Sequence, residues 1–167
     1  ESTVREMGRT ATGVRGMTLD ETGDDEVIGM ICIKDPEKET VMVVSEQGYG
    51  KRSEIEDYRI TNRGGKGVKT LNITEKTGNL VAIKSVTDEN DLVIINKSGI
   101  TLRMKVADVR IMGRATQGVR LINLEKRNDE IASVCKVLSE TESDSSNSEN
   151  IDSASEINEA EASETTE

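Results

Sequence analysis

The feature that most constrains the fold of this chain is an internal repeat. Three segments align without gaps: MGRTATGVRGM (Met7–Met17), TNRGGKGVKTL (Thr61–Leu71) and MGRATQGVRLI (Met112–Ile122). We call them the first, second and third anchors. The valine that they share recurs after 54 and then 51 residues. In addition, EQGYGKRSEIEDYRI (residues 46–60) matches KSGITLRMKVADVRI (residues 97–111) at an offset of 51. Two landmarks with one offset indicate a real repeat, and such a period decides the architecture.

Each repeat unit is predicted to consist of β-strands. The runs Val41–Val44 and Leu92–Ile95 are short, apolar and largely β-branched, as in strands that are buried on both faces. Each run is followed by a glycine turn and a second strand, which we expect to reach Ile60 or Ile111. A further strand is predicted to open at the same place after each anchor, at Val27-Ile28, Leu80-Val81 and Glu130-Ile131.

A period near 50 residues with about four strands per unit predicts blades packed around an axis. One blade cannot bury its own faces, so neighbouring blades must supply an aliphatic core, because Phe and Trp are absent. We expect an all-β, propeller-like domain over residues 1–138, with repeats at about 8–61, 62–112 and 113–138. Each unit should lend its last strand to the anchor that follows. These two and a half blades leave a ring open, so we expect a fragment with further blades upstream.

The acidic charge is concentrated at the C-terminal end. Residues 139–167 hold ten of the 32 acidic residues and no basic one, so the other 22 balance the 22 basic residues of the body. This Ser- and Glu-rich tail has too few apolar groups to offset an ordering entropy of roughly 1–2 kcal/mol per residue, and we expect it to be disordered. A solubilising role is the simpler interpretation. The alternative is a mimic of phosphate charge that competes with DNA for the body.

The residue types exclude several kinds of function. Histidine is absent, and two distant cysteines, Cys32 and Cys135, indicate neither a disulfide framework nor a metal site. We expect no catalytic residues and no cofactor in this chain. No apolar run approaches the roughly 20 residues that span a bilayer, and no signal peptide is visible. A cytoplasmic protein without a membrane partner is expected.

Basic residues recur at equivalent positions of the repeat. Arg5, Arg59 and Arg110 share one position, Arg9, Arg63 and Arg114 a second, and Arg15, Lys69 and Arg120 a third. Arg52 matches Arg103 after the glycine turn, and Lys51, Lys66 and Lys105 complete the predicted DNA-binding set. Because a blade repeat places equivalent residues on equivalent parts of a rim, a periodic basic stripe is predicted. The acidic residues of the body fall mainly in the variable loops.

A periodic cationic rim suits the backbone of DNA, which carries one phosphate charge per ~1.7 Å of duplex axis. Such contacts position a duplex without reading its bases, and a curved stripe also bends it. The alternative is an ordinary solvated strand face. Gly64, Gly65 and Gly67 around Lys66 could let backbone donors approach a phosphate, or could simply form a tight turn. The spacing is not that of a P-loop.

The three anchors and the stretch QGYGKRSEIEDYRI resemble the last blades of the C-terminal domain of DNA gyrase A subunits over residues 1 to about 138, and the acidic tail is similar too. The resemblance implies a β-pinwheel whose blades exchange strands and whose basic rim wraps DNA. That family's box, QRRGGKG, lies in its first blade. Here residues 61–67 match only RGGKG, so they are a degenerate relative of the box and remain a possible DNA contact.

The resemblance also implies a role within a type II topoisomerase, in bacterial cytoplasm and on the chromosome. There the A subunits form a homodimer with B subunits that hydrolyse ATP, with Mg²⁺, and an upstream tyrosine cleaves DNA. The resemblance implies that this tyrosine lies in an upstream domain. The tyrosines of this chain, Tyr49 in a predicted turn and Tyr58 in a predicted strand, are interpreted as structural. The implied contribution is geometric: wrapping that biases strand passage toward negative supercoiling.

Two alternatives stay open. One is the related C-terminal domain of a topoisomerase IV A subunit, which serves decatenation and has similar blades with a degenerate box. The other is a protein-binding propeller without a DNA role, although Trp is absent and the WD and kelch signatures are missing.

Overall fold

The computed structural model describes residues 5–21, 23, 25–124 and 128–139, and contacts within the chain group residues 1–137 into one compact unit. The fold described below is that unit. It contains strands and two single 3-10 turns, and the described part of the chain has no α-helix. The elements in chain order are β1 (Thr40–Ser45), β2 (Tyr49–Glu54), η1 (Ile55–Asp57), β3 (Leu80–Val86), β4 (Asn90–Asn96), β5 (Thr101–Lys105), η2 (Val106–Asp108), β6 (Val119–Arg120) and β7 (Ile131–Leu138). The predicted all-β class is confirmed.

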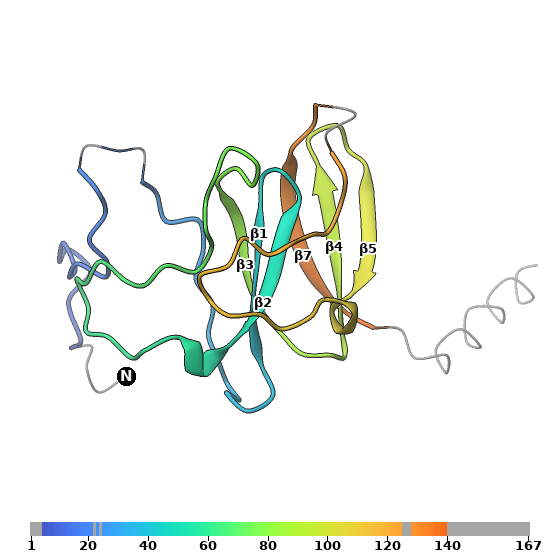
Figure 1. Ribbon diagram of the computed structural model, residues 1–167. Coiled ribbons are helices and arrows are strands. Elements are labelled where there is room, and N and C mark those ends of the chain that lie inside the picture. Colours follow the sequence, from blue (N-terminus) through green and yellow to red (C-terminus); the bar gives the residue numbers. More distant parts are fainter. Residues whose placement is uncertain (1–4, 22, 24, 125–127, 140–167) are drawn as a thin grey trace, which may run out of the picture. The chain divides into compact units, whose positions relative to one another are not determined.

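The strands form two sheets, one with the order β3-β1-β2-β6 and the other with the order β5-β4-β7 (Figure 1). The offset of 51 found in the sequence relates them, since it carries β1 onto β4, β2 onto β5, η1 onto η2 and β3 onto β7. In both sheets a hairpin pairs with the strand that follows the next anchor. The two sheets are therefore two copies of one blade.

Within the described part of the chain, only the first sheet has a fourth strand, and this strand comes from a later unit. β6 belongs to the third anchor and pairs antiparallel with β2, with Tyr49 opposite Arg120 and Gly50 opposite Val119. Ile111 also forms a parallel bridge with Arg52. Strand exchange between units is thus present, with a direction different from our expectation: the third anchor lends a strand to an earlier hairpin.

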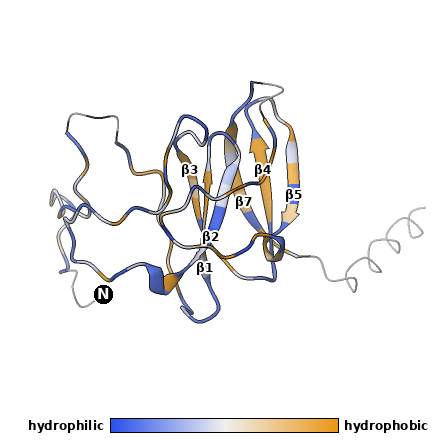
Figure 2. Ribbon diagram, in the orientation of Figure 1, coloured by the Kyte–Doolittle hydropathy of each residue, from blue (hydrophilic) through white to orange (hydrophobic). Residues whose placement is uncertain are grey.

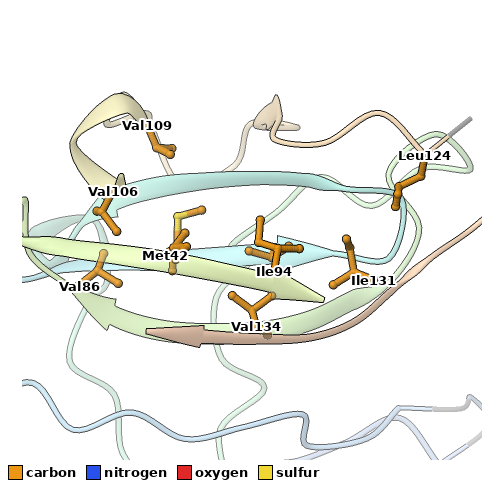
Figure 3. Packing of buried hydrophobic residues seen from close by; sticks show 11 residues of the cluster. Met42, Val86, Ile94, Val106, Val109, Leu124, Ile131 and Val134 are labelled. Atoms are coloured by element: carbon orange, nitrogen blue, oxygen red, sulfur yellow. The ribbon is translucent and has the colours of Figure 1, made fainter. Parts of the chain in front are cut away.

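The main core lies between the two sheets (Figure 3). β1 alternates its side chains, because Met42 and Val44 enter this core while Val41 and Val43 pack with Leu71 on the opposite face. All six residues of β1 are buried. Full burial of one such aliphatic side chain contributes about 1.5–3 kcal/mol. The prediction that this apolar run is a strand buried on both faces is confirmed.

Glycines with positive φ mark equivalent points of the repeat. The glycine before the shared valine has φ of 87° at Gly13, 79° at Gly67 and 79° at Gly118. Only at Gly118 is space also limiting, because a Cβ there would lie 2.5 Å from the carbonyl oxygen of Gly50. The three anchors therefore share a backbone conformation at this glycine. Of these three glycines, only Gly118 also lies close to the backbone of β2.

Two details of the strand prediction are wrong. The second strand of each hairpin ends at Glu54 or Lys105, where η1 or η2 begins, and does not continue to Ile60 or Ile111. No strand forms at Val27-Ile28, and Val27 is 68% exposed. The strands that follow the later anchors pair with β1 and β4, whereas the described residues before Val27 contain no hairpin. A strand needs a ladder partner for its backbone groups.

Candidate nucleic-acid interface

Neighbouring anchors lie side by side and are joined by the same hydrogen bond. The amide of Thr18 donates to the carbonyl oxygen of Gly65 over 3.0 Å, and the amide of Asn72 donates to that of Thr116 over 3.1 Å. The offsets of 54 and 51 relate donor to donor and acceptor to acceptor. Successive anchors are thus placed by one repeated contact, which puts equivalent side chains in equivalent positions along the row.

Most of the predicted DNA-binding cations are exposed. Arg114 is half-buried, and the exposed ones other than Arg103, which pairs with Asp91, are Arg5, Arg9, Arg15, Arg59, Arg63, Lys66, Lys69, Lys105, Arg110 and Arg120. Apart from Arg120, none of these eleven residues forms an ion pair with a carboxylate of the described residues. The charges of the other ten are therefore available to an external anion. Lys66 is the least favourable of them, because it lines an open hollow together with Asp20, Glu21 and Asp25.

Arg114 connects three parts of the repeat. Its guanidinium donates to the carbonyl oxygen of Asp57, at the end of η1, over 3.1 Å, and to the carbonyl oxygen of Lys69 in the second anchor. The structure thus brings Arg114 and Lys69 together. A guanidinium has five N–H donors, so these two bonds leave others free to meet a phosphate.

Arg120 lies against the buried ring of Tyr49. Its Cζ is 5.6 Å from the ring centroid, and its Nη2 donates to the phenolic oxygen over 3.0 Å. Lys76 Nζ lies 5.7 Å from the centroid of the same ring. Sequence reasoning missed Lys76 as a member of this group. It aligns with Arg127 at the offset of 51, and this recurrence could have identified it.

The prediction that Lys51 and Arg52 contact DNA is wrong, because both side chains are buried. β2 is an inner strand, and it is hydrophilic among apolar neighbours (Figure 2). Lys51 is 0% exposed and Arg52 is 3% exposed. Lys51 Nζ donates to the carbonyl oxygens of Gly113, over 2.7 Å, and Arg114. Burial lowers the pKa of Lys51 to about 8, with the nearby Asp57 opposing and Arg114 reinforcing that shift.

Arg52 holds the two blades together. Its Nη1 lies 2.7 Å from Asp88 Oδ1 and donates to the carbonyl oxygen of Val106 over 3.2 Å, while its Nε donates to Thr40 Oγ1. Its repeat counterpart Arg103 pairs with Asp91 over 2.8 Å, and the Arg103 side chain is 41% exposed. Because the Asp91 carboxylate offsets the charge of Arg103, the structure gives less support to the prediction that Arg103 binds DNA.

The described residues contain no group of three or more His, Cys, Asp or Glu side chains that could hold a metal, and none of their helices has the length and apolar character of a membrane span. Cys32 and Cys135 are exposed free thiols. The Tyr58 hydroxyl is hydrogen-bonded to Thr70 Oγ1, and Tyr49 carries Arg120. The predicted acidic tail lies, from residue 140 on, outside the described residues.

A strand-exchanged β repeat with exposed cations on neighbouring anchors defines a domain of the propeller class. The chain belongs to the family described as DNA gyrase C-terminal domain, beta-propeller, which matches residues 1–34, 39–87 and 90–135. It is 48% identical over 149 residues to the DNA gyrase A subunit of Staphylococcus aureus (strain NCTC 8325 / PS 47) and 54% identical over 124 residues to that of strain MRSA252. These alignments cover 89% and 74% of this chain, but only 16% and 14% of the relatives.

Solved structures agree with this assignment. A DNA gyrase A C-terminal domain matches with a TM-score of 0.66 and 28% identity, covering 81% of this chain and 45% of that one. A C-terminal domain of DNA topoisomerase IV matches with a TM-score of 0.74 and 23% identity, covering 82% of this chain and 42% of that one, and shows the fold alone. The resemblance to gyrase A inferred from the anchors is confirmed.

Proposed function

We propose that this chain binds and wraps double-stranded DNA through the exposed cations of its anchors. The observation that carries the proposal is the repeated hydrogen bond from Thr18 to Gly65 and from Asn72 to Thr116. It sets the anchors in one row, so cations such as Arg9, Arg63 and Arg114 follow one another with the spacing of the repeat. Binding along such a row is independent of base sequence and depends strongly on salt.

The wider role follows from the relatives, of which this chain spans 16% of the length. Within a gyrase of two A and two B subunits, the wrapped duplex would present a crossing of fixed handedness to the strand-passage machinery. ATP hydrolysis with Mg²⁺ and DNA cleavage would then take place in other parts of the enzyme, with negative supercoiling on the bacterial chromosome as the result. The gyrase names of the relatives favour this role over decatenation by a topoisomerase IV.

The second anchor offers the sharpest test, because its cations take no part in the sheets. In the intact gyrase A protein, Arg63→Ala with Lys69→Ala should weaken binding to random duplexes alike and flatten the slope of log K against log salt by about 2. The matched control removes two exposed charges outside the anchors, Lys34→Ala with Lys38→Ala, and should leave the slope nearly unchanged.

Filter binding at several salt concentrations measures both slopes. Equal slopes for the two double variants would refute the anchor surface as the DNA-binding site. Supercoiling and decatenation assays on the assembled enzyme then separate the gyrase role from the topoisomerase IV role.

A further inference from the structure

β2 is a buried strand with polar side chains, and these side chains indicate a specific structural role. Lys51 and Ser53 share the face of β2 that lies over Val43 and Val41, and both are 0% exposed. Taking an ammonium group out of water costs several kcal/mol unless its donors are satisfied. Lys51 forms no ion pair within the described residues, so carbonyl groups must satisfy it.

The carbonyl groups that accept hydrogen bonds from Lys51 and Ser53 belong to three successive residues of the third anchor. Ser53 Oγ donates to the carbonyl oxygen of Met112 over 3.0 Å, and Lys51 Nζ donates to those of Gly113 and Arg114. In the reverse direction, the Met112 amide donates to the carbonyl oxygen of Arg52 over 2.8 Å. The first turn of the third anchor is therefore held from beneath by β2.

These hydrogen bonds to β2 determine the positions of the cations of the third anchor. With the carbonyl oxygen of Arg114 fixed on Lys51, the Arg114 side chain extends to Asp57 and Lys69 at the neighbouring anchor. Farther along the same segment, Arg120 pairs with Tyr49 of β2 in the sheet. A displacement of the first turn would move both cations relative to the row of anchors.

The other blade supplies a natural comparison. At the offset of 51, Lys51 corresponds to Leu102 and Ser53 corresponds to Met104, both in β5. β5 is the last strand of its sheet, and no described anchor pairs with it. The buried donors thus occur on the strand that carries an anchor and are replaced by apolar side chains on the strand that does not.

We propose that Lys51 is a positioning residue for DNA binding: its buried ammonium holds the carbonyl groups of Gly113 and Arg114 and thereby sets Arg114 and Arg120 in line with the other anchors. This inference rests on the proposed function of the anchors. It adds that a lysine with no access to DNA controls the geometry of the contact.

The test uses the intact gyrase A protein in a double-mutant cycle. Lys51→Met removes the charge and all donors, and should weaken DNA binding about tenfold and flatten the salt slope by about 1 to 2. The same loss should be absent in a background that carries Arg114→Ala and Arg120→Ala, because Lys51 acts through those cations. In the Arg63→Ala, Lys69→Ala background the loss should persist in full.

Two further variants guard against a trivial result. Lys51→Gln keeps N–H donors without the charge and should recover most of the affinity. Lys34→Met removes an exposed charge outside the anchors without touching the third anchor, and should have an effect below about twofold. Folding of each variant is checked by its urea midpoint.

The outcomes separate the two proposals. If both Lys51→Met and Lys51→Gln fail to fold, or if the loss for Lys51→Met adds in full to that of Arg114→Ala with Arg120→Ala, the positioning role is overturned and Lys51 serves stability alone. If the second-anchor double variant itself binds DNA like the wild type, the proposed function fails, whatever the Lys51 variants do.

Discussion

The second and third anchors occupy equivalent positions of the repeat and share its Arg, Gly and Val, but they have different structures. In the third, Val119-Arg120 forms β6 on β2, whereas the matching Val68-Lys69 of the second anchor is not part of a strand. Gly67 and Gly118 nevertheless have the same φ of 79°. The comparison teaches that the anchor sequence specifies a turn, while a neighbouring strand decides whether the residues after the turn become part of a sheet.

The same lesson holds for the strand that follows each anchor. β3 and β7 form because β1 and β4 accept their backbone hydrogen bonds. The equivalent residues from Val27 onward have comparable apolar content but no such acceptor among the described residues, and Met30 is 93% exposed. Hydrophobic pattern alone therefore does not produce a strand here.

The largest difference between the two anchors is expected for their glycines. Gly118→Ala places a Cβ 2.5 Å from the Gly50 carbonyl oxygen at a positive φ, and should lower the free energy of unfolding by about 3 kcal/mol or more. Gly67→Ala meets only the flexible end of Met17 at 3.6 Å and should cost about 1 kcal/mol. Urea unfolding measures both free energies. Equal losses of stability in the two variants would contradict the distinction between the third anchor, which pairs with β2, and the second anchor, which pairs with no strand.

The next largest effect compares the two hairpins. Arg52→Ala leaves the carbonyl oxygen of Val106 and the Thr40 hydroxyl without this donor in a buried site, and should cost about 2–3 kcal/mol. Arg103→Ala removes a half-exposed guanidinium from Asp91, whose side chain is 9% exposed, and should cost about 1–2 kcal/mol. Thermal or urea unfolding measures the loss of stability in each variant. A larger loss for Arg103→Ala than for Arg52→Ala would contradict the greater structural role of the inner strand β2.

The last prediction concerns pH. The pKa of Lys51 falls from its ordinary 10.5 to about 8 in the folded protein because the ammonium is buried. Below pH 8 both states are protonated and the cost of burial is fully present. Between about pH 8 and 10.5 the unfolded chain binds more protons, so the free energy of unfolding should rise with pH. This rise in the free energy of unfolding should be missing in Lys51→Met. Unfolding free energies that change with pH in the same way in both proteins would contradict the prediction.

Much of the fold could be predicted from the sequence because it is written in local patterns. The apolar runs of β1 and β4 and the turns at Gly48 and Gly99 recur with one offset, and the structure keeps φ of 78° and 86° at those two glycines. Arg63 and Lys69 were likewise found from recurrence alone, and both are exposed. Their contact with DNA stays a prediction.

By itself, the sequence determined the β class, the period and the places where the chain must turn, because glycine conformation and side-chain polarity act over a few residues. The tertiary structure alone decided that Lys51 and Arg52 are buried and that the third anchor supplies a fourth strand. The reason is physical: whether a strand is inner or outer depends on partners some seventy residues away, such as Arg120 for Tyr49. A cation that looks like a surface contact in the sequence becomes an internal hydrogen-bond donor once both edges of its strand are covered.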